Sequence, residues 1–316
     1  MVGRLGVLVA TVIVAVVLGH VFLSASVDEV PLGEVLSGTP AWFGDVLGGD
    51  LGETPGGHCT QIGPFGNYEP LCASYDASTV SDMLRTRVPI DLSLLLGGLL
   101  VGIMFGVAVG RHCATHPSSV ATRVLHVLTA FQLSTPVFFL ALLVIYSFSS
   151  NVTEFVRLPF LSGSGDYVPF GEDPVGYVKA MWIPWLLAGL PLAAFLARLT
   201  ESTLREQLQE DYVRTARAKG VRERRIVDRH ALPVTTPSLA AMASVNISTL
   251  LLNVAVIEYV YGIPGMFRVV YTVAKKQDVP VMEAMILEGV ILIVLANFIA
   301  DVVQYRLDPR LVQQRV

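Results

Sequence analysis

Few reactive side chains in this sequence are spaced for catalysis or metal binding. The phosphate-binding pattern G-x-x-x-x-G-K-[ST] is absent, as are H-E-x-x-H and G-x-S-x-G, the commonest patterns of zinc proteases and serine hydrolases. His112 and His116 are one helical turn apart, with Cys113 beside them, but no acidic residue or third well-placed ligand accompanies the pair. We interpret all three as part of a solvated loop and predict no metal site.

Two other histidines, His20 and His126, fall within apolar segments, and neither has an obvious partner in the sequence. A membrane enzyme would need paired acids, a Ser/His pair or metal ligands inside such segments. We therefore predict that the chain is not an enzyme and binds no cofactor of its own.

Two polar stripes also lie within apolar segments. One contains Asn246, Thr249 and Asn253, at i, i+3 and i+7 of a helix, and the other contains Asn297 and Asp301, at i and i+4. Stripes of this kind line cavities in some membrane proteins and form hydrogen bonds between helices in others. Both interpretations stay open, and the five residues are candidates for lining a path through the membrane.

The elements that position these residues are apolar helices. Of the 316 residues, 53% are hydrophobic and 15% are charged, and the mean hydropathy is +0.60. Six segments reach the roughly 20 apolar residues that a span needs, at about residues 5–23, 90–110, 124–148, 182–199, 237–257 and 281–303. An all-α polytopic membrane protein is predicted. Arg4 and the small residues 24–26 also fit a signal peptide, but the apolar run between them is long for one, which favours an uncleaved helix.

A kink is expected in the third segment at Pro136. With the N-terminus in the cytoplasm, 15 of the 22 Lys and Arg residues fall in internal segments, so the positive-inside rule places both termini in the cytoplasm. Residues 26–89 then form a partly ordered external loop. Cys59 and Cys72 lie in it, where an oxidising compartment would favour a disulfide; two unpaired thiols are the alternative.

A dense cluster of charge separates the fourth and fifth segments. Residues 211–230 contain ten charged side chains. At roughly 3 kcal/mol per charge at the membrane centre, such a segment does not span. The simplest interpretation is a cytoplasmic basic loop that touches anionic lipid.

The uncharged positions in this cluster carry a second signal. They form a narrow stripe at helical spacing, made of Tyr212, Val213, Ala216 and Gly220. We predict a short surface helix that Asp211 caps and Gly220 ends, then a second charged helix, then a sharp turn at the Leu-Pro pair 232–233 with Pro237 opening the fifth span. Small residues on one face favour docking into a partner.

Residues 212–233 resemble the EAA loop of ABC-importer permeases, whose pattern is E-A-A, three residues, Gly, nine residues and I-x-L-P. The matching positions are Ala216, Gly220, Leu232 and Pro233. The departures are Arg214 for Glu, Thr215 for the first Ala and His230 for Ile. The form of residues 212–220 is similar to that of the B-type subunit in the oligopeptide, dipeptide and nickel branch.

Other stretches extend the resemblance over about residues 80–311. The family's E-x-x-F-x-x-P-G turn is matched by Glu258, Pro264 and Gly265, with Tyr261 in place of Phe and Phe267 in place of a usual Gly. Residues 307–310 resemble its L-D-P-R and residues 49–52 its G-D-L-G. Glu258 either holds the Pro-Gly turn by a hydrogen bond, which we favour, or lines the path.

The resemblance implies a type I ABC importer permease fold and several partners. A second permease subunit, expected to be a different C-type chain, would complete the path, and two cytoplasmic subunits would bind ATP and Mg²⁺. An external binding protein would deliver the substrate. The chain would lie in the lipid bilayer of a prokaryotic cell membrane, without a nucleic-acid partner. The ATPase-coupling residues would be Tyr212, Arg214, Thr215, Ala216, Arg217, Lys219 and Gly220.

Transport of oligopeptides or dipeptides is the expected function, with nickel or a sugar as an alternative cargo and an ATPase-independent channel or secondary transporter as an alternative mechanism. The expected division is a first transmembrane helix at 1–25, the external loop at 26–89, the permease domain at 90–311 with its coupling loop at about 200–236, and a cytoplasmic tail at 312–316.

Overall fold

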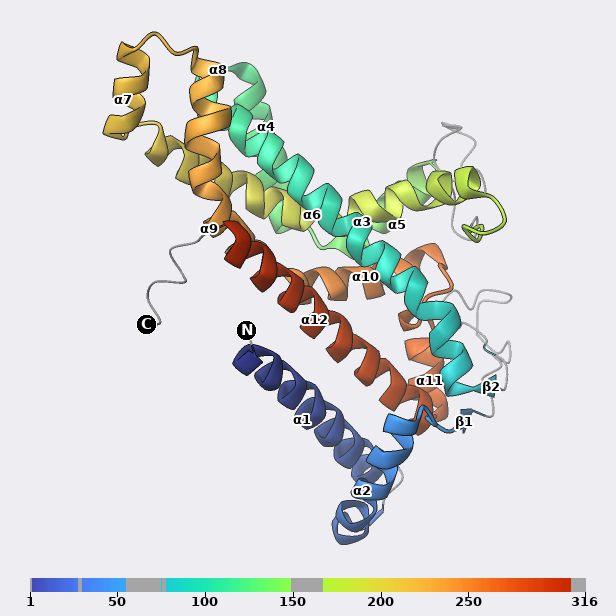
Figure 1. Cartoon of the computed structure of the whole chain (residues 1–316). Coiled ribbons are helices and arrows are strands. Elements are labelled where there is room, and N and C mark those ends of the chain that lie inside the picture. Colours follow the sequence, from blue (N-terminus) through green and yellow to red (C-terminus); the bar gives the residue numbers. More distant parts are fainter. Residues whose placement is uncertain (1, 28–29, 55–74, 76–77, 149–166, 308–316) are drawn as a thin grey trace. The chain divides into compact units, whose positions relative to one another are not determined.

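The computed structural model describes residues 2–27, 30–54, 75, 78–148 and 167–307, and these residues are mostly helical (Figure 1). The first half contains α1 (Val2–Ser26), α2 (Leu32–Gly48), β1 (Glu53–Thr54), β2 (Ser78–Thr79), α3 (Val80–Thr115), α4 (Val120–Ser134) and α5 (Val137–Phe148). The second half contains α6 (Pro174–Gln207), α7 (Asp211–Ala218), α8 (Glu223–Ile226), the π-helix η1 (Val227–Ala231), α9 (Leu232–Val245), α10 (Ile247–Tyr261), the 3₁₀-helix η2 (Phe267–Val269), α11 (Val270–Lys276) and α12 (Val279–Leu307).

Among the described residues, four helices are long and apolar enough to cross a membrane alone: α1, α3, α6 and α12. Two bent pairs raise the number to six if each pair forms one span. These are α4 with α5, bent by 109°, and the run from α8 to α9 with α10, bent by 50°. The predicted helical membrane architecture is confirmed.

The third predicted segment is broken rather than kinked. Thr135, between α4 and α5, is extended, with φ −108° and ψ 123°. The ring of Pro136 disfavours the helical conformation for the residue before it, and proline has no N–H to continue the ladder. The expectation of a kink inside one helix was therefore wrong in degree, because the chain leaves the helix altogether at Thr135.

The chain divides into two compact units, residues 1–93 with 255–295 and residues 94–254 with 296–316. In the second unit α6 packs against α4, α5 and α9. Glycines on α3 let it approach α6 closely, at Gly98, Gly102, Gly106 and Gly110. A Cβ on Gly106 would lie 2.7 Å from Leu196 Cβ and 2.9 Å from the carbonyl oxygen of Ala193. Only glycine permits this spacing between the two backbones.

The first unit holds an ordered structure within the segment that the sequence predicted as a partly ordered external loop. The 17-residue helix α2 ends at Gly49, whose φ of 83° is left-handed, and the two-residue strands β1 and β2 pair antiparallel. An apolar cluster lies beside them, made of Tyr75, Val80, Met83, Met266, Val269, Val273, Val281, Ala284 and Met285. Asp278 accepts hydrogen bonds from the hydroxyls of Thr54 and Tyr75. Burial and this contact raise the pKa of Tyr75 to about 12.

Candidate coupling surface

The loop between α6 and α9 contains the predicted short helix, which is α7. Its end is a Schellman motif, in which the N–H of Gly220 donates to the carbonyl of Arg217 at 2.9 Å and the N–H of Val221 donates to that of Ala216 at 3.1 Å. Gly220 has φ +72°, a conformation in which a side chain is strained. Asp211 is the first helical residue and not the cap, since the N-cap is Glu210, without a side-chain hydrogen bond.

One side of α7 faces the protein and the other is open. Val213 is fully buried and Ala216 is half-buried. Tyr212 is 40% exposed, so it does not share the buried side predicted for it. The exposed positions of α7 and its C-terminus are Asp211, Tyr212, Arg214, Thr215, Arg217, Ala218, Lys219 and Gly220.

Charged side chains fix α7 to α8. The Nε and Nη2 of Arg217 donate to the two carboxylate oxygens of Glu223 at 3.0 and 2.6 Å. The hydrogen bond to Glu223 raises the pKa of the Arg217 guanidinium. Arg214 makes only a 3.4 Å contact with Asp211, and both side chains are well exposed. Arg217 therefore has a partner inside the chain, whereas Arg214 points to solvent.

The predicted sharp turn at the Leu-Pro pair is absent. Residues 223–245 form one helical run in which η1 links α8 to α9, and Pro233 and Pro237 lie inside α9. The N–H of Leu232 donates to the carbonyl of Val227, which is a π-type contact. A proline ring clashes with the carbonyl four residues before it, and a wider turn relieves that clash. The reversal lies instead between α7 and α8, after Gly220 (Figure 1).

This helical run is anchored to the ends of α3 and α6. Arg111 donates from Nε and Nη2 to the two carboxylate oxygens of Asp228 at 2.7 and 3.1 Å. A small apolar cluster adds contacts between the same elements and consists of Ala114, Leu204, Val227 and Ala231, with Leu208 and Leu232 packed against it.

The surface beside α7 is strongly basic. A cavity of about 600 Å³ is lined by Lys219, Gly220, Val221, Arg222, Arg224, Arg225, Asp228 and Arg229. Five of these eight residues are Lys or Arg and one is acidic. Such a surface favours a partner that presents carboxylates.

The turn after α10, in the first unit, is held by buried carboxylates. Glu258 is fully buried and accepts from the N–H of Phe267 at 3.0 Å. Asp91 is also fully buried and accepts from the N–H of Met266 at 3.0 and 3.1 Å. Gly265 lies against both carboxyl groups, so a Cβ there would overlap Asp91 and Glu258. These contacts support a structural role for Glu258.

Asp91 and Arg87 lie on α3 and contact this turn, and neither was a candidate from the sequence. Arg87 donates from Nη1 to the carbonyl of Gly265 at 3.1 Å. The sequence did offer one signal, since Asp91 is an acidic residue inside an apolar segment. A charged side chain is energetically unfavourable in lipid, so such a residue usually has a partner.

The first polar stripe is divided by a helix break. Asn246 lies between α9 and α10 and donates from Nδ2 to the carbonyl of Met242 at 2.8 Å. Thr249 on α10 is exposed and Asn253 is half-buried. On α12, Asn297 and Asp301 are both half-buried. The candidate path residues on regular helix are therefore Thr249, Asn253, Asn297 and Asp301.

The histidines and cysteines differ from expectation. Cys113 is buried in the last turn of α3, so the solvated loop predicted for it is wrong. The rings of His112 and His116 stack with centroids 5.0 Å apart. His20 and His126, for which the sequence showed no obvious partner, contact Glu283 at 2.7 Å and Glu201 at 2.8 Å. Cys59 and Cys72 lie outside the described residues.

Comparison with known proteins identifies the family. Residues 98–313 match the family described as "Binding-protein-dependent transport system inner membrane component". A putative peptide transport system permease protein of Brucella abortus (strain 2308) is 30% identical over 231 residues, which cover 73% of this chain and 71% of the relative. An oligopeptide transport system permease protein of Bacillus subtilis (strain 168) is 26% identical over 270 residues, which cover 85% and 78%.

A probable peptide ABC transporter permease protein of Sinorhizobium fredii (strain NBRC 101917 / NGR234) is 25% identical over 270 residues, again covering 85% of this chain and 78% of the relative. The resemblance to permeases of the oligopeptide branch is thereby confirmed. The chain belongs to the family of binding-protein-dependent transport system inner membrane components.

Proposed function

We propose that this chain is one permease subunit of an ATP-driven peptide importer and that α7 is its coupling helix. The three relatives described above are peptide or oligopeptide permease proteins by name, which supports a peptide cargo. A second permease subunit, two cytoplasmic ATPase subunits and an external binding protein complete the transporter. The termini and α7 lie in the cytoplasm of a prokaryotic cell, as the distribution of Lys and Arg favours.

One observation carries the coupling role: α7 is exposed on one side and fixed to the spans on the other. The ion pair of Arg217 and Glu223 is about half exposed and contributes at most about 1 kcal/mol. Burial of Val213 contributes more, roughly 1.5–3 kcal/mol. The apolar contacts therefore hold the helix, and the charges orient it.

Force applied to α7 has a direct route to the spans. It would pass from α7 to α8 through their packing contacts, which the Arg217–Glu223 pair orients, and then through η1 and the Arg111–Asp228 pair to α3. Closure of the ATPase subunits around ATP would displace α7 as a rigid body and change which side of the membrane the path faces. Thr249, Asn253, Asn297 and Asp301 are proposed to line that path.

The test is substitution of Gly220 in the reconstituted transporter. Gly220→Val forces a β-branched residue into left-handed geometry, at about 1–3 kcal/mol, and should disrupt the end of α7. We expect peptide uptake to fall by at least tenfold while the chain still inserts. Gly220→Asn should retain most uptake, because asparagine tolerates this conformation.

A matched control is Gly171→Val, since Gly171 also has open space around it but no left-handed φ. This variant should transport normally. Uptake and peptide-stimulated ATP hydrolysis that are unchanged in Gly220→Val would refute the coupling role of α7.

A further inference from the structure

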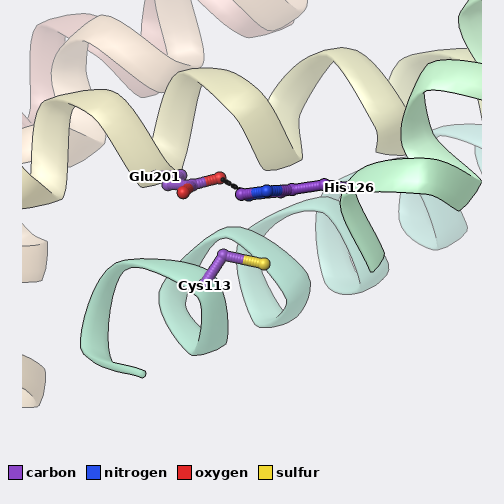
Figure 2. Close-up of side chains that lie close together, drawn as sticks. All are labelled: Cys113, His126 and Glu201. Atoms are coloured by element: carbon purple, nitrogen blue, oxygen red, sulfur yellow. Dashed lines mark hydrogen bonds and ion pairs between the residues drawn. The ribbon is translucent and has the colours of Figure 1, made fainter. Parts of the chain in front are cut away.

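Three side chains with metal-binding atoms meet in the second unit, and they come from three different helices (Figure 2). They are Cys113 on α3, His126 on α4 and Glu201 on α6. One ligand atom from each, the sulfur, a ring nitrogen and a carboxylate oxygen, lies within 4.8 Å of the other two. These positions are 13 and 75 residues apart in sequence, so no motif spacing reveals the group.

We propose that Cys113, His126 and Glu201 bind a borderline-soft divalent cation, with Zn²⁺ as the best fit. A thiolate, an imidazole and a carboxylate are the three ligand types that Zn²⁺ takes in proteins, at about 2.3, 2.0–2.1 and 2.0–2.2 Å. Hard cations such as Mg²⁺ and Ca²⁺ prefer oxygen atoms alone. The proposal replaces the expectation from the sequence that the chain binds no metal.

The ligand positions need only small movements to bind the ion. His126 Nε2 is 2.8 Å from Glu201 Oε2. Two ligand atoms on a tetrahedral zinc are about 3.3 Å apart, so this pair must open by roughly half an ångström. The sulfur of Cys113 lies within 4.8 Å of both the histidine nitrogen and the carboxylate oxygen, so it needs to move only a short distance towards them.

The surrounding helices hold the ligands in place. Gly110, three residues before Cys113, lies so close to α6 that a Cβ would overlap the carbonyl oxygen of Ala197. Ser119 caps α4 by accepting from the N–H of Thr122, and the Thr122 hydroxyl donates to the carbonyl of His116 at 2.7 Å. These contacts fix the starts and ends of the helices near the site, as preorganised metal sites require.

Arg205 is a positively charged neighbour that competes with a metal ion for the Glu201 carboxylate. Its Nη2 is 2.6 Å from Glu201 Oε1 and donates to the carbonyl of Cys113 at 3.2 Å. It therefore occupies one carboxylate oxygen and leaves Oε2 directed at His126. Metal binding must release the thiol proton of Cys113, after which two anionic ligands and the neutral imidazole face the ion.

Access to the site is from the His126 side. The His126 side chain is 47% exposed, whereas Cys113 is 1% exposed. A cavity of about 340 Å³ adjoins it, lined by His126, Thr129, Arg198 and Glu201. A water molecule from this cavity can supply the fourth ligand of a tetrahedral site.

The test uses Co²⁺ as a spectroscopic substitute for Zn²⁺ on the purified full-length chain in detergent. We expect about one ion per chain, release of one proton from the thiol, and a thiolate-to-Co²⁺ charge-transfer band that added Zn²⁺ abolishes. Cys113→Ser should remove the band, and His126→Gln should weaken binding by at least about 100-fold, since even indirect partners of a metal contribute 10–100-fold.

His112→Gln and His116→Gln are the matched controls, because they change neighbouring histidines that are not among the three proposed ligands. Both should bind as the parent chain does. Size-exclusion chromatography ensures that only folded protein is titrated. Because His126 is exposed, His126→Gln tests the site even if Cys113→Ser does not fold. Absence of a charge-transfer band in the parent chain, persistence of the band in Cys113→Ser, or unchanged affinity in His126→Gln would each overturn the site.

Discussion

At the scale of single residues, the turn after α10 depends on a position where no side chain fits. Gly265 lies against the carboxyl groups of Asp91 and Glu258, and those groups accept the N–H groups of the next two residues. Among the described residues Glu258 Oε1 has no hydrogen-bond partner. Buried N–H groups without partners are costly, and here each of the two N–H groups is paired with one of the carboxyl groups. A methyl group at 265 would separate them.

We therefore expect Gly265→Ala to reduce thermal stability strongly, by about 1–3 kcal/mol for overpacking plus the loss of buried hydrogen bonds. The comparison is Gly44→Ala in α2, where an added Cβ has no neighbour within 4 Å. That variant should be neutral or gain up to about 1 kcal/mol, because alanine favours the helix. Thermal unfolding in detergent measures both, and equal midpoints would contradict this account of the turn.

The sequence anticipated Glu258 and its turn because both lie in one short motif. The role of Asp91 could not be predicted from the sequence, because its partner, the N–H of Met266, is 175 positions away and only folding brings them together. The grouping of Cys113, His126 and Glu201 could not be predicted for the same reason. Local spacing shows which residues share a helix face, but it does not show which faces meet.

At the scale of elements, the contact between α3 and α6 is built from glycine. Gly98, Gly102, Gly106 and Gly110 are spaced one turn apart and are buried against α6. In lipid, such close approach replaces the hydrophobic driving force that is missing between helices. The four-residue repeat was visible in the sequence, although the helix that it faces was not.

Gly106→Leu should push α6 away from α3, because even a Cβ at this position would contact Leu196 and Ala193 at 2.7 and 2.9 Å. We expect loss of folded protein on size exclusion. Ala108→Leu, on the exposed side of the same helix, is the control and should be folded. Normal folding of Gly106→Leu would show that the close packing of α3 and α6 is dispensable.

Periodicity located the apolar helices well and their interruptions poorly. The sequence pattern predicted α7 and its termination at Gly220, because the stripe of uncharged residues and the glycine are both local features. It predicted only a kink where the helix breaks at Thr135, and it missed the π-turn at 227–231, because packing decides between proline geometry and a continued helix. It also missed α2, whose apolar residues are interleaved with Gly and Pro.

At the scale of the whole molecule, the proposed orientation in the membrane rests on the distribution of Lys and Arg. The proposed topology requires α4 and α5 to cross the membrane once as a pair, so that the α5–α6 loop is external and α7 internal. A membrane-impermeant thiol reagent tests this with two exposed positions, Gly171→Cys and Lys219→Cys, in a background with Cys59→Ser and Cys72→Ser.

Gly171→Cys should react in intact cells, and Lys219→Cys only after permeabilisation. Cys113 is buried and should not react with the reagent in either sample. Reaction of both engineered cysteines from the same side would contradict the topology and indicate that α4 and α5 return to the membrane face from which they entered.

The π-turn at 227–231 makes the number of residues in this segment important, independently of which residues they are. An α-helix rotates about 100° and rises about 1.5 Å for each residue, so one residue removed between Val227 and Ala231 would convert the wide turn to a regular one. The preceding segment would then rotate by more than a quarter-circle, and the carboxylate of residue 228 would leave Arg111. A single codon lost there would therefore point α7, the proposed coupling helix, in a different direction.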